Sequence, residues 1–350
     1  MGKNGLKVSF LVNRQGVGGA IRSTVVVGNS FLSRGHSVRI FYRNGVLSFR
    51  RRLGSIYNRL RYGPADDWLS EFRGSSLGYY KLDPDKFSSD DIVLSMCAQT
   101  TLDLWSMPKS IGIKVLYCRG AEIENWENML SSWKLPIPKI AVSNHLFRMM
   151  MKEASPPLIG VVPNGIDINQ YFPCVPDCER TGIGTILGSS HPKDPDTAIR
   201  VMRILGKRLP DVPRYMFSFV RSHYRLGKIH FKRQPTVAEA RKMYSSCKVW
   251  FLSSISEGFP NPILEAMACG CAVVSTDCGG PRDIIQDGVN GFLVGVGNIG
   301  AMVYKIMMLY KDDKLRKRIC ANAMRTVQKF TWSKAADKLE NHLYSIRNNY

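Results

Sequence analysis

Two glutamates separated by seven residues mark the segment of this chain most suited to chemistry. Glu257 and Glu265 lie in the run EGFPNPILEAMACG at residues 257–270. The run predicts a loop that leads into a helix, with Asn261 as N-cap, the next proline as first helical residue and Gly270 as its stop. Amides at a helix start attract anions, and carboxylates accept hydrogen bonds from hydroxyls. A ligand that carries both phosphate and hydroxyl groups, such as a nucleotide sugar, would suit this segment.

A glycine-rich run near the N-terminus is a second candidate phosphate site. The run QGVGGA at residues 15–20 follows a predicted strand and precedes a helical stretch. Gly18 and Gly19 allow backbone amides to approach a phosphate, although the same glycines also suit a turn needed only for packing. The spacing does not match G-x-G-x-x-G, so a nicotinamide dehydrogenase is weakly supported.

The elements that must position these loops are short apolar runs alternating with stretches of helical period. Strands are predicted at residues 8–12, 38–42, 92–96, 115–118, 140–143, 159–162, 185–187, 215–220, 249–253 and 272–276. This alternation indicates an α/β fold with doubly wound parallel sheets, in which ligands bind beyond the carboxyl ends of strands. A chain of 350 residues exceeds the usual size of one core, so two domains are expected, with a junction near residue 175.

The region around the two glutamates resembles the E-x7-E region of retaining glycosyltransferases of family 4. The similarity is carried by residues 257–270, by VVSTDCGG at 273–280 and by DGVNGFLV at 287–294. Weaker similarity covers the Gly18-Gly19 loop with RGH at 34–36, VPNGID at 162–167, and FTWS at 330–333.

This resemblance implies the GT-B fold, in which two Rossmann-like doubly wound domains face a central cleft. Residues 1–173 would form the N-terminal, acceptor-side domain. Residues 174–331 would bind the nucleotide-sugar donor, and a closing helix at 332–350 would pack back on the N-terminal domain.

The resemblance also implies roles for individual residues. Glu257 would contact hydroxyls of the donor sugar during catalysis, and Glu265 would contact the ribose. Donor contacts are also expected near Gly258, Phe259, Asn261 and Ile263. Lys193 would bind the diphosphate, whereas Ser189 stands where the family commonly has arginine, so Ser189 or His191 is left for the second contact.

Several relatives in this family carry a histidine after a central N-terminal strand, where this chain has RGAE at 119–122. Arg119 or Glu122 would then face the reacting sugar, and either residue would equally suit a structural ion pair. No acidic cluster resembles the metal-binding aspartates of the other main glycosyltransferase fold. We therefore expect no metal and no cofactor, with the nucleotide sugar as substrate.

Basic residues dominate the N-terminal part of the chain. Residues 1–65 contain twelve Lys or Arg and no Asp or Glu, within a formal net charge of +21. Residues 49–62 place apolar side chains at helical spacing among five arginines: Arg50, Arg51, Arg52, Arg59 and Arg61. We call this segment the basic arm. It is typical of a helix lying on anionic lipid, and a solvated basic helix is the alternative.

The apolar runs are too short for a membrane span, the N-terminus lacks a signal peptide's apolar centre, and the nine cysteines lack zinc-site spacing. We expect a cytoplasmic protein, peripheral on the inner face of the membrane. The predicted activity is retaining transfer of a hexose to a glycan or lipid-linked acceptor in cell-surface polysaccharide or glycolipid synthesis. The alternatives are a GT-B nucleotide-sugar epimerase and a basic nucleic-acid-binding protein, although no nucleic-acid-binding motif is recognisable.

Overall fold

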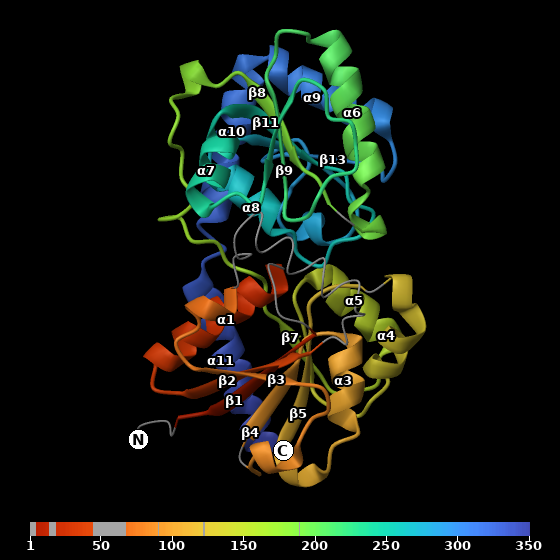
Figure 1. Cartoon of the computed structure of the whole chain (residues 1–350), viewed down its shortest axis with the longest axis vertical. Coiled ribbons are helices and arrows are strands. Elements are labelled where there is room, and N and C mark those ends of the chain that lie inside the picture. Colours follow the sequence, from red (N-terminus) through yellow and green to blue (C-terminus); the bar gives the residue numbers. More distant parts are fainter. Residues whose placement is uncertain (1–4, 14–18, 45–67, 90, 122, 189) are drawn as a thin grey trace. The chain divides into compact units, whose positions relative to one another are not determined.

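The computed structural model describes residues 5–13, 19–44, 68–89, 91–121, 123–188 and 190–350. The chain forms two compact units. The first contains Met1–Pro163 and Trp332–Tyr350, and the second contains Asn164–Thr331. Each unit has a parallel sheet flanked by helices (Figure 1).

Among its described residues, the first unit has a seven-stranded parallel sheet in the order β3-β2-β1-β4-β5-β6-β7. The strands are β1 (Lys7–Val12), β2 (Ser37–Arg43), β3 (Ser75–Tyr79), β4 (Asp91–Ser95), β5 (Ile113–Cys118), β6 (Lys139–Ala141) and β7 (Leu158–Val161). The helices are α1 (Gly19–Ser33), α3 (Ala98–Trp105), α4 (Trp126–Trp133), α5 (Asn144–Glu153) and α11 (Trp332–Asn349). Central β1 pairs with β2 and β4, so its Val8 lies opposite both Val38 and Ile92.

The C-terminal helix α11 belongs to the first unit although it follows the whole of the second in sequence. Its Glu340 accepts hydrogen bonds from Arg34 and from Nε2 of His36, the latter over 2.9 Å. The backbone N–H of Leu6 donates to Nδ1 of the same imidazole, over 3.1 Å. Because Nδ1 is an acceptor, the ring proton lies on Nε2, and His36 links Leu6, directly before β1, to α11.

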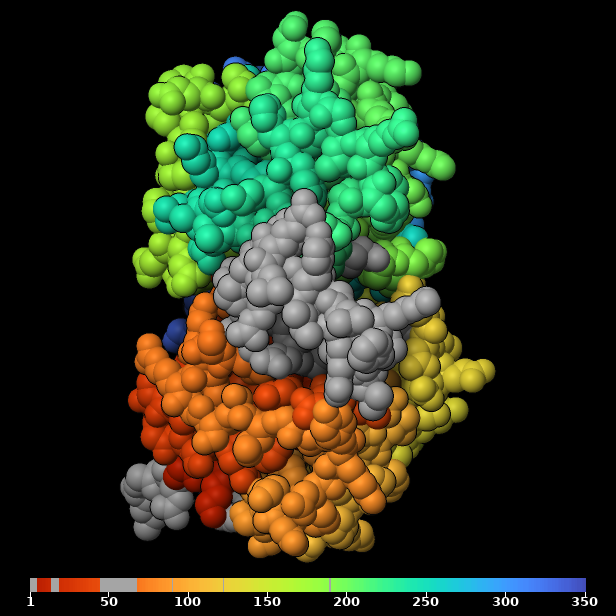
Figure 2. All heavy atoms as spheres, in the orientation of Figure 1, coloured from red at the N-terminus to blue at the C-terminus, as the bar shows by residue number. Residues whose placement is uncertain are grey.

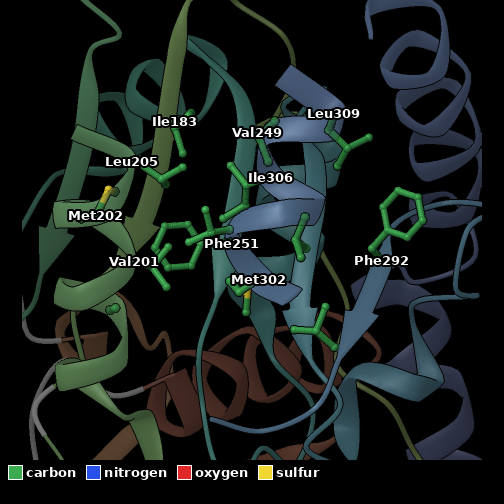
Figure 3. Packing of buried hydrophobic residues seen from close by; sticks show 14 of the residues in the cluster. Ile183, Val201, Met202, Leu205, Val249, Phe251, Phe292, Met302, Ile306 and Leu309 are labelled. Carbon is green, nitrogen blue, oxygen red and sulfur yellow. The ribbon is translucent and has the colours of Figure 1, made fainter. Parts of the chain in front are cut away.

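The second unit has, in the part that the structure describes, a six-stranded parallel sheet in the order β10-β9-β8-β11-β12-β13. Its strands are β8 (Gly182–Ile186), β9 (Arg214–Ser218), β10 (Ile229–Arg233), β11 (Cys247–Leu252), β12 (Ala272–Thr276) and β13 (Phe292–Val294). Its helices are α6 (Pro195–Arg208), α7 (Val237–Ser245), α8 (Asn261–Ala268), α9 (Ile299–Lys311) and α10 (Asp313–Val327). Side chains of β11, α6 and α9 pack together in its core, with Phe251, Met202 and Ile306 fully buried (Figure 3).

The predicted fold class is confirmed, since both units are Rossmann-like and each predicted strand overlaps an observed one. The predicted boundary after residue 173 is wrong, because the second unit begins at Asn164. The Asn164 side chain donates to the Phe259 carbonyl over 3.2 Å and to Oδ1 of Asn261 over 2.7 Å. The amide of Ile166 also donates to the carbonyl of Phe330, over 2.9 Å. These bonds join residues after Pro163 to the second unit.

Candidate functional site

Three loops meet at the carboxyl ends of β8, β11 and β12, which are neighbours in the second sheet. The first loop contains the 3-10 turn η6 (His191–Lys193), the second carries Glu257, and the third runs from β12 to Gly280. The amide of Ile255 donates to the carbonyl of Pro192 over 2.8 Å. The amide of Gly280 donates to the carbonyl of Glu257 over 3.0 Å. The loop that carries Glu257 is therefore held from both sides.

Two glycines allow these loops to pack so closely. A Cβ atom on Gly280 would lie 2.4 Å from the carbonyl oxygen of Gly258, and one on Gly188 would lie 2.1 Å from Cβ of Lys193. Real Cβ atoms do not approach other atoms to these distances. The backbone at Gly258 and the side chain of Lys193 therefore occupy the space that any larger residue would need.

Glu257 is a buried carboxylate with both oxygens paired. The Nζ atom of Lys193 donates to Oε1 and Oε2 over 2.8 and 2.7 Å. The hydroxyl of Ser254 also donates to Oε1, over 2.7 Å. The Lys193 side chain is 45% exposed, and an ammonium has three donors. It can therefore reach an added anion while it still neutralises Glu257.

Glu265, the second carboxylate, lies in α8 and is also buried. Its Oε2 accepts a hydrogen bond of 2.9 Å from the phenol of Tyr244, which is fully buried in α7. Burial and the nearby Glu265 raise the pKa of Tyr244 well above its ordinary value. The phenol therefore stays protonated and acts as the donor.

The start of α8 differs from the prediction. Asn261 is the first helical residue and Pro260 is the N-cap, so the predicted N-cap is wrong. The reason is that Oδ1 of Asn261 accepts the hydrogen bond from Asn164. The predicted stop is confirmed, because α8 ends at Ala268 and Gly270 follows with a φ of +83°.

Of the other donor candidates in this segment, Phe259 is buried and packs against Phe330, with 5.5 Å between ring centroids. The amide of Ile263 donates to the carbonyl of Pro260 over 3.2 Å. Gly258 lies against Gly280, as described above. Ligand contacts by these residues stay predictions. His191, in η6, is exposed.

Two predicted site residues of the first unit, Arg119 and Gly19, are connected through Ser23. The guanidinium of Arg119, which follows β5, donates to the hydroxyl of Ser23, and that hydroxyl donates to the carbonyl of Gly19 over 2.9 Å. The guanidinium also lies over the ring of Tyr117, 4.7 Å from its centroid. Arg119 is thus attached to the start of α1. The remaining candidates lie outside the described residues: Gly18, Glu122, Ser189, Arg50, Arg51, Arg52, Arg59 and Arg61.

Sequence reasoning missed three residues that hold this site together: Ser254, Tyr244 and Asn164. Ser254 lies three residues before Glu257, so the sequence alone could have placed it near that carboxylate. Asn164 lies within the VPNGID run, which carries weak family similarity but no predicted site residue. No sequence pattern indicated Tyr244, because it lies 21 residues from its partner Glu265 and on a different helix.

The thiol of Cys278 lies near Glu257 and is not ionised. Burial and the nearby Glu257 raise the pKa of Cys278 to about 12, so this thiol is neutral at physiological pH.

In the described ranges no three His, Cys, Asp or Glu side chains gather as a metal-binding group. None of the described helices has the length and apolar character needed to span a membrane.

Residues 220–326 match the family described as glycosyl transferases group 1. A relative from Campylobacter jejuni, N-acetylgalactosamine-N,N'-diacetylbacillosaminyl-diphospho-undecaprenol 4-alpha-N-acetylgalactosaminyltransferase, is 38% identical over 100 residues. That match covers 28% of this chain and 26% of the relative. D-inositol 3-phosphate glycosyltransferase from Paenarthrobacter aurescens is 29% identical over 201 residues, which cover 51% of this chain and 49% of the relative.

Solved structures resemble the chain over nearly its whole length. Anabaena HepE in complex with UDP and glucose gives a TM-score of 0.77 at 16% identity, with 97% of this chain and 100% of that one covered. Sucrose-phosphate synthase from Thermosynechococcus elongatus gives 0.76 at 13% identity, with 99% and 100% covered. At these identities the likeness shows the fold alone. Residues 220–326, which include Glu257 and Glu265, thus match the glycosyl transferases group 1 family, and the whole chain has the GT-B fold.

Proposed function

We propose that this chain transfers a sugar from a nucleotide-diphosphate donor to an acceptor, with the donor bound in the second unit. The observation that carries the proposal is the pair of buried carboxylates within the family match, Glu257 in a loop held by its neighbours and Glu265 in α8. Carboxylates accept hydrogen bonds from hydroxyls, and the adjacent Lys193 supplies positive charge for a diphosphate. These are the groups that a nucleotide sugar presents.

In the proposed reaction, Glu265 binds the ribose, Glu257 binds hydroxyls of the sugar, and Lys193 binds the diphosphate. The bond between the anomeric carbon and the diphosphate oxygen breaks, and a bond to an acceptor hydroxyl oxygen forms. The acceptor proton leaves with the diphosphate or passes to solvent. Lys193 stabilises the negative charge that develops on the leaving group. Because an ammonium supplies this charge, we propose that transfer needs no metal and persists in EDTA.

We propose further that the sugar is a hexose, transferred with retention of anomeric configuration to a glycan or lipid-linked acceptor. The resemblance to family 4 supports retention. The undecaprenol-linked substrate named for the Campylobacter relative supports a lipid-linked acceptor. The basic arm supports an enzyme that binds the inner face of an anionic membrane.

The test is a panel of nucleotide sugars built on UDP, GDP, ADP and dTDP, each incubated with the protein and with undecaprenyl-diphosphate-linked sugars in vesicles. We expect one donor to be consumed, with release of its nucleoside diphosphate, and NMR of the product to show the donor's anomeric configuration. If no member of the panel binds or is consumed, the proposed function is wrong. An inverted product would refute retention alone, and conversion of the donor sugar without acceptor would indicate an epimerase.

A further inference from the structure

Each motif carboxylate is held by one buried hydroxyl from outside the motif, Ser254 for Glu257 and Tyr244 for Glu265. We propose that Tyr244 is a positioning residue that fixes Glu265 for hydrogen bonding to ribose hydroxyls, and that it thereby sets the preference of the site for ribonucleotides over deoxyribonucleotides. This inference rests on the proposed function, because it assumes that Glu265 binds the ribose.

The phenol of Tyr244 is fixed by its surroundings. Its ring lies 4.3 Å from the ring of Trp250 and 5.6 Å from that of Phe217, measured between centroids. The carbonyl of Tyr244 also accepts a hydrogen bond from the thiol of Cys271, over 3.0 Å. A ring enclosed in this way has one position, so the hydroxyl donates from a fixed point in α7 to Glu265 in α8.

This donor determines how the Glu265 carboxylate is presented. Glu265 is only 8% exposed, so small rotations of its side chain change which of its lone pairs are accessible. A carboxylate has about four acceptor sites, and a phenol that occupies one of them at Oε2 orients the others. The phenol cannot exchange roles with the carboxylate, because burial and Glu265 itself keep it protonated.

Discrimination between ribose and deoxyribose requires that the Glu265 carboxylate keep a fixed orientation. A site that hydrogen-bonds a hydroxyl rejects the analogue that lacks it, because the buried acceptor is left unpaired. An acceptor that is free to turn away loses less when the hydroxyl is missing. Loss of the Tyr244 hydroxyl should therefore weaken ribonucleotide binding more than deoxyribonucleotide binding.

The experiment measures dissociation constants of the whole chain for UDP, GDP and ADP and for their 2′-deoxy and 3′-deoxy forms, by calorimetry. The variants are Tyr244→Phe and, as a matched control, Tyr310→Phe, whose hydroxyl donates to the carbonyl of Thr181 over 3.0 Å. For the diphosphate that binds most tightly, we expect Tyr244→Phe to reduce the ribose preference by about 3- to 10-fold, the range for the net contribution of an ordinary hydrogen bond. Tyr310→Phe should keep the wild-type preference.

A double variant keeps the test decisive if Tyr244→Phe folds poorly. Tyr244→Phe with Glu265→Gln removes the buried charge that would otherwise lose the phenol as a donor, and its ribose preference should equal that of Glu265→Gln alone. A further fall in the double variant would overturn the inference, because the effect would not pass through Glu265. An unchanged preference in folded Tyr244→Phe, with the preference lost in Glu265→Gln, would overturn the inference and leave the proposed function standing. No binding of any diphosphate by the wild type would refute both.

Discussion

At the scale of single residues, the site is organised around the need to bury two carboxylates. Burying a carboxylate is unfavourable unless hydrogen bonds and opposite charge compensate it. Glu257 obtains both from Lys193 and Ser254, and Glu265 accepts a hydrogen bond from Tyr244. Groups buried at this cost are candidates for function rather than for stability.

Glu265→Ala should weaken binding of the donor nucleotide. The change removes a charged acceptor for the ribose hydroxyls, and the loss should be roughly 1.5 to 3 kcal/mol of binding free energy. Calorimetric titration with the nucleoside diphosphate measures it, and circular dichroism verifies the fold. An unchanged dissociation constant would rule out Glu265 as the ribose ligand.

Lys193→Met should weaken binding of nucleoside diphosphates because the ammonium beside Glu257 is lost. The Lys193 side chain is 45% exposed, so solvent screens its charge. We therefore expect a modest loss, about tenfold in the dissociation constant, which corresponds to about 1.4 kcal/mol. Lys207→Met, on the exposed side of α6, is the matched control. Equal affinities for the two variants would place the phosphate contact elsewhere.

At the scale of elements, the sequence predicted the middle of each sheet and missed three of the four edge strands. The three strands that were not predicted, β3, β10 and β13, are all edge strands. Central β4 is buried along its whole length, whereas the first four residues of β3 are exposed. A strand buried on both faces reads as a continuous apolar run, and an edge strand does not. The exposed strand β3 therefore had no clear apolar signal to read, and β13, although apolar, spans only three residues.

The same contrast applies to the candidate site. Glu257 and Glu265 were predictable because they lie in one continuous motif at the end of a buried strand. Tyr244 lies in α7, and the rings around it come from Phe217 in β9 and Trp250 in β11. Only the folded sheet brings these three elements together. The pairing of Lys193 with Glu257 likewise joins loops 64 residues apart. Such contacts depend on strand order, which the local sequence pattern does not determine.

Gly280→Ala should separate the loops that hold Glu257. Its new Cβ would lie 2.4 Å from the backbone oxygen of Gly258, so the loop must shift, and both the melting temperature and diphosphate affinity should fall. The control is Gly300→Ala in α9, where the nearest atom, Oδ1 of Asn298, lies 3.7 Å away. That helical change should leave affinity unaltered and stabilise the fold by about 0.5 to 1 kcal/mol. Wild-type affinity and melting temperature in Gly280→Ala would contradict this account of the loops.

At the scale of the whole molecule, the formal net charge of +21 predicts an anionic partner. The charge extends beyond the basic arm. The segment from α6 to β10, green in Figure 2, covers much of the second unit in that view. Its exposed basic residues include Arg203, Lys207, Arg221, Arg225, Lys228 and Lys232. Two basic regions can therefore be tested for contact with an anionic surface.

Changing Arg50, Arg51 and Arg52 together to Ser should release the protein from anionic vesicles. Each basic residue near such a surface contributes about 1 kcal/mol, so the loss should be large at physiological salt. Turnover of a soluble acceptor analogue should stay near wild type, because only the membrane contact is removed. Vesicle sedimentation measures binding, and Arg221, Arg225 and Lys228 changed to Ser form the comparison variant. If only that second variant is released, the membrane surface lies on the second unit.

The central claim is that Glu257 acts on the sugar of a nucleotide-sugar donor, and one purified variant tests it. Glu257→Gln keeps the shape of the side chain, but it removes the negative charge beside an electron-deficient anomeric carbon and exchanges one acceptor oxygen for a donor. We predict that this variant loses most transfer activity and still binds the bare nucleoside diphosphate, measured as transfer rate and calorimetric affinity on the same preparation. Transfer at the wild-type rate would contradict the account, and loss of diphosphate affinity would show that Glu257 binds the nucleotide instead of the sugar.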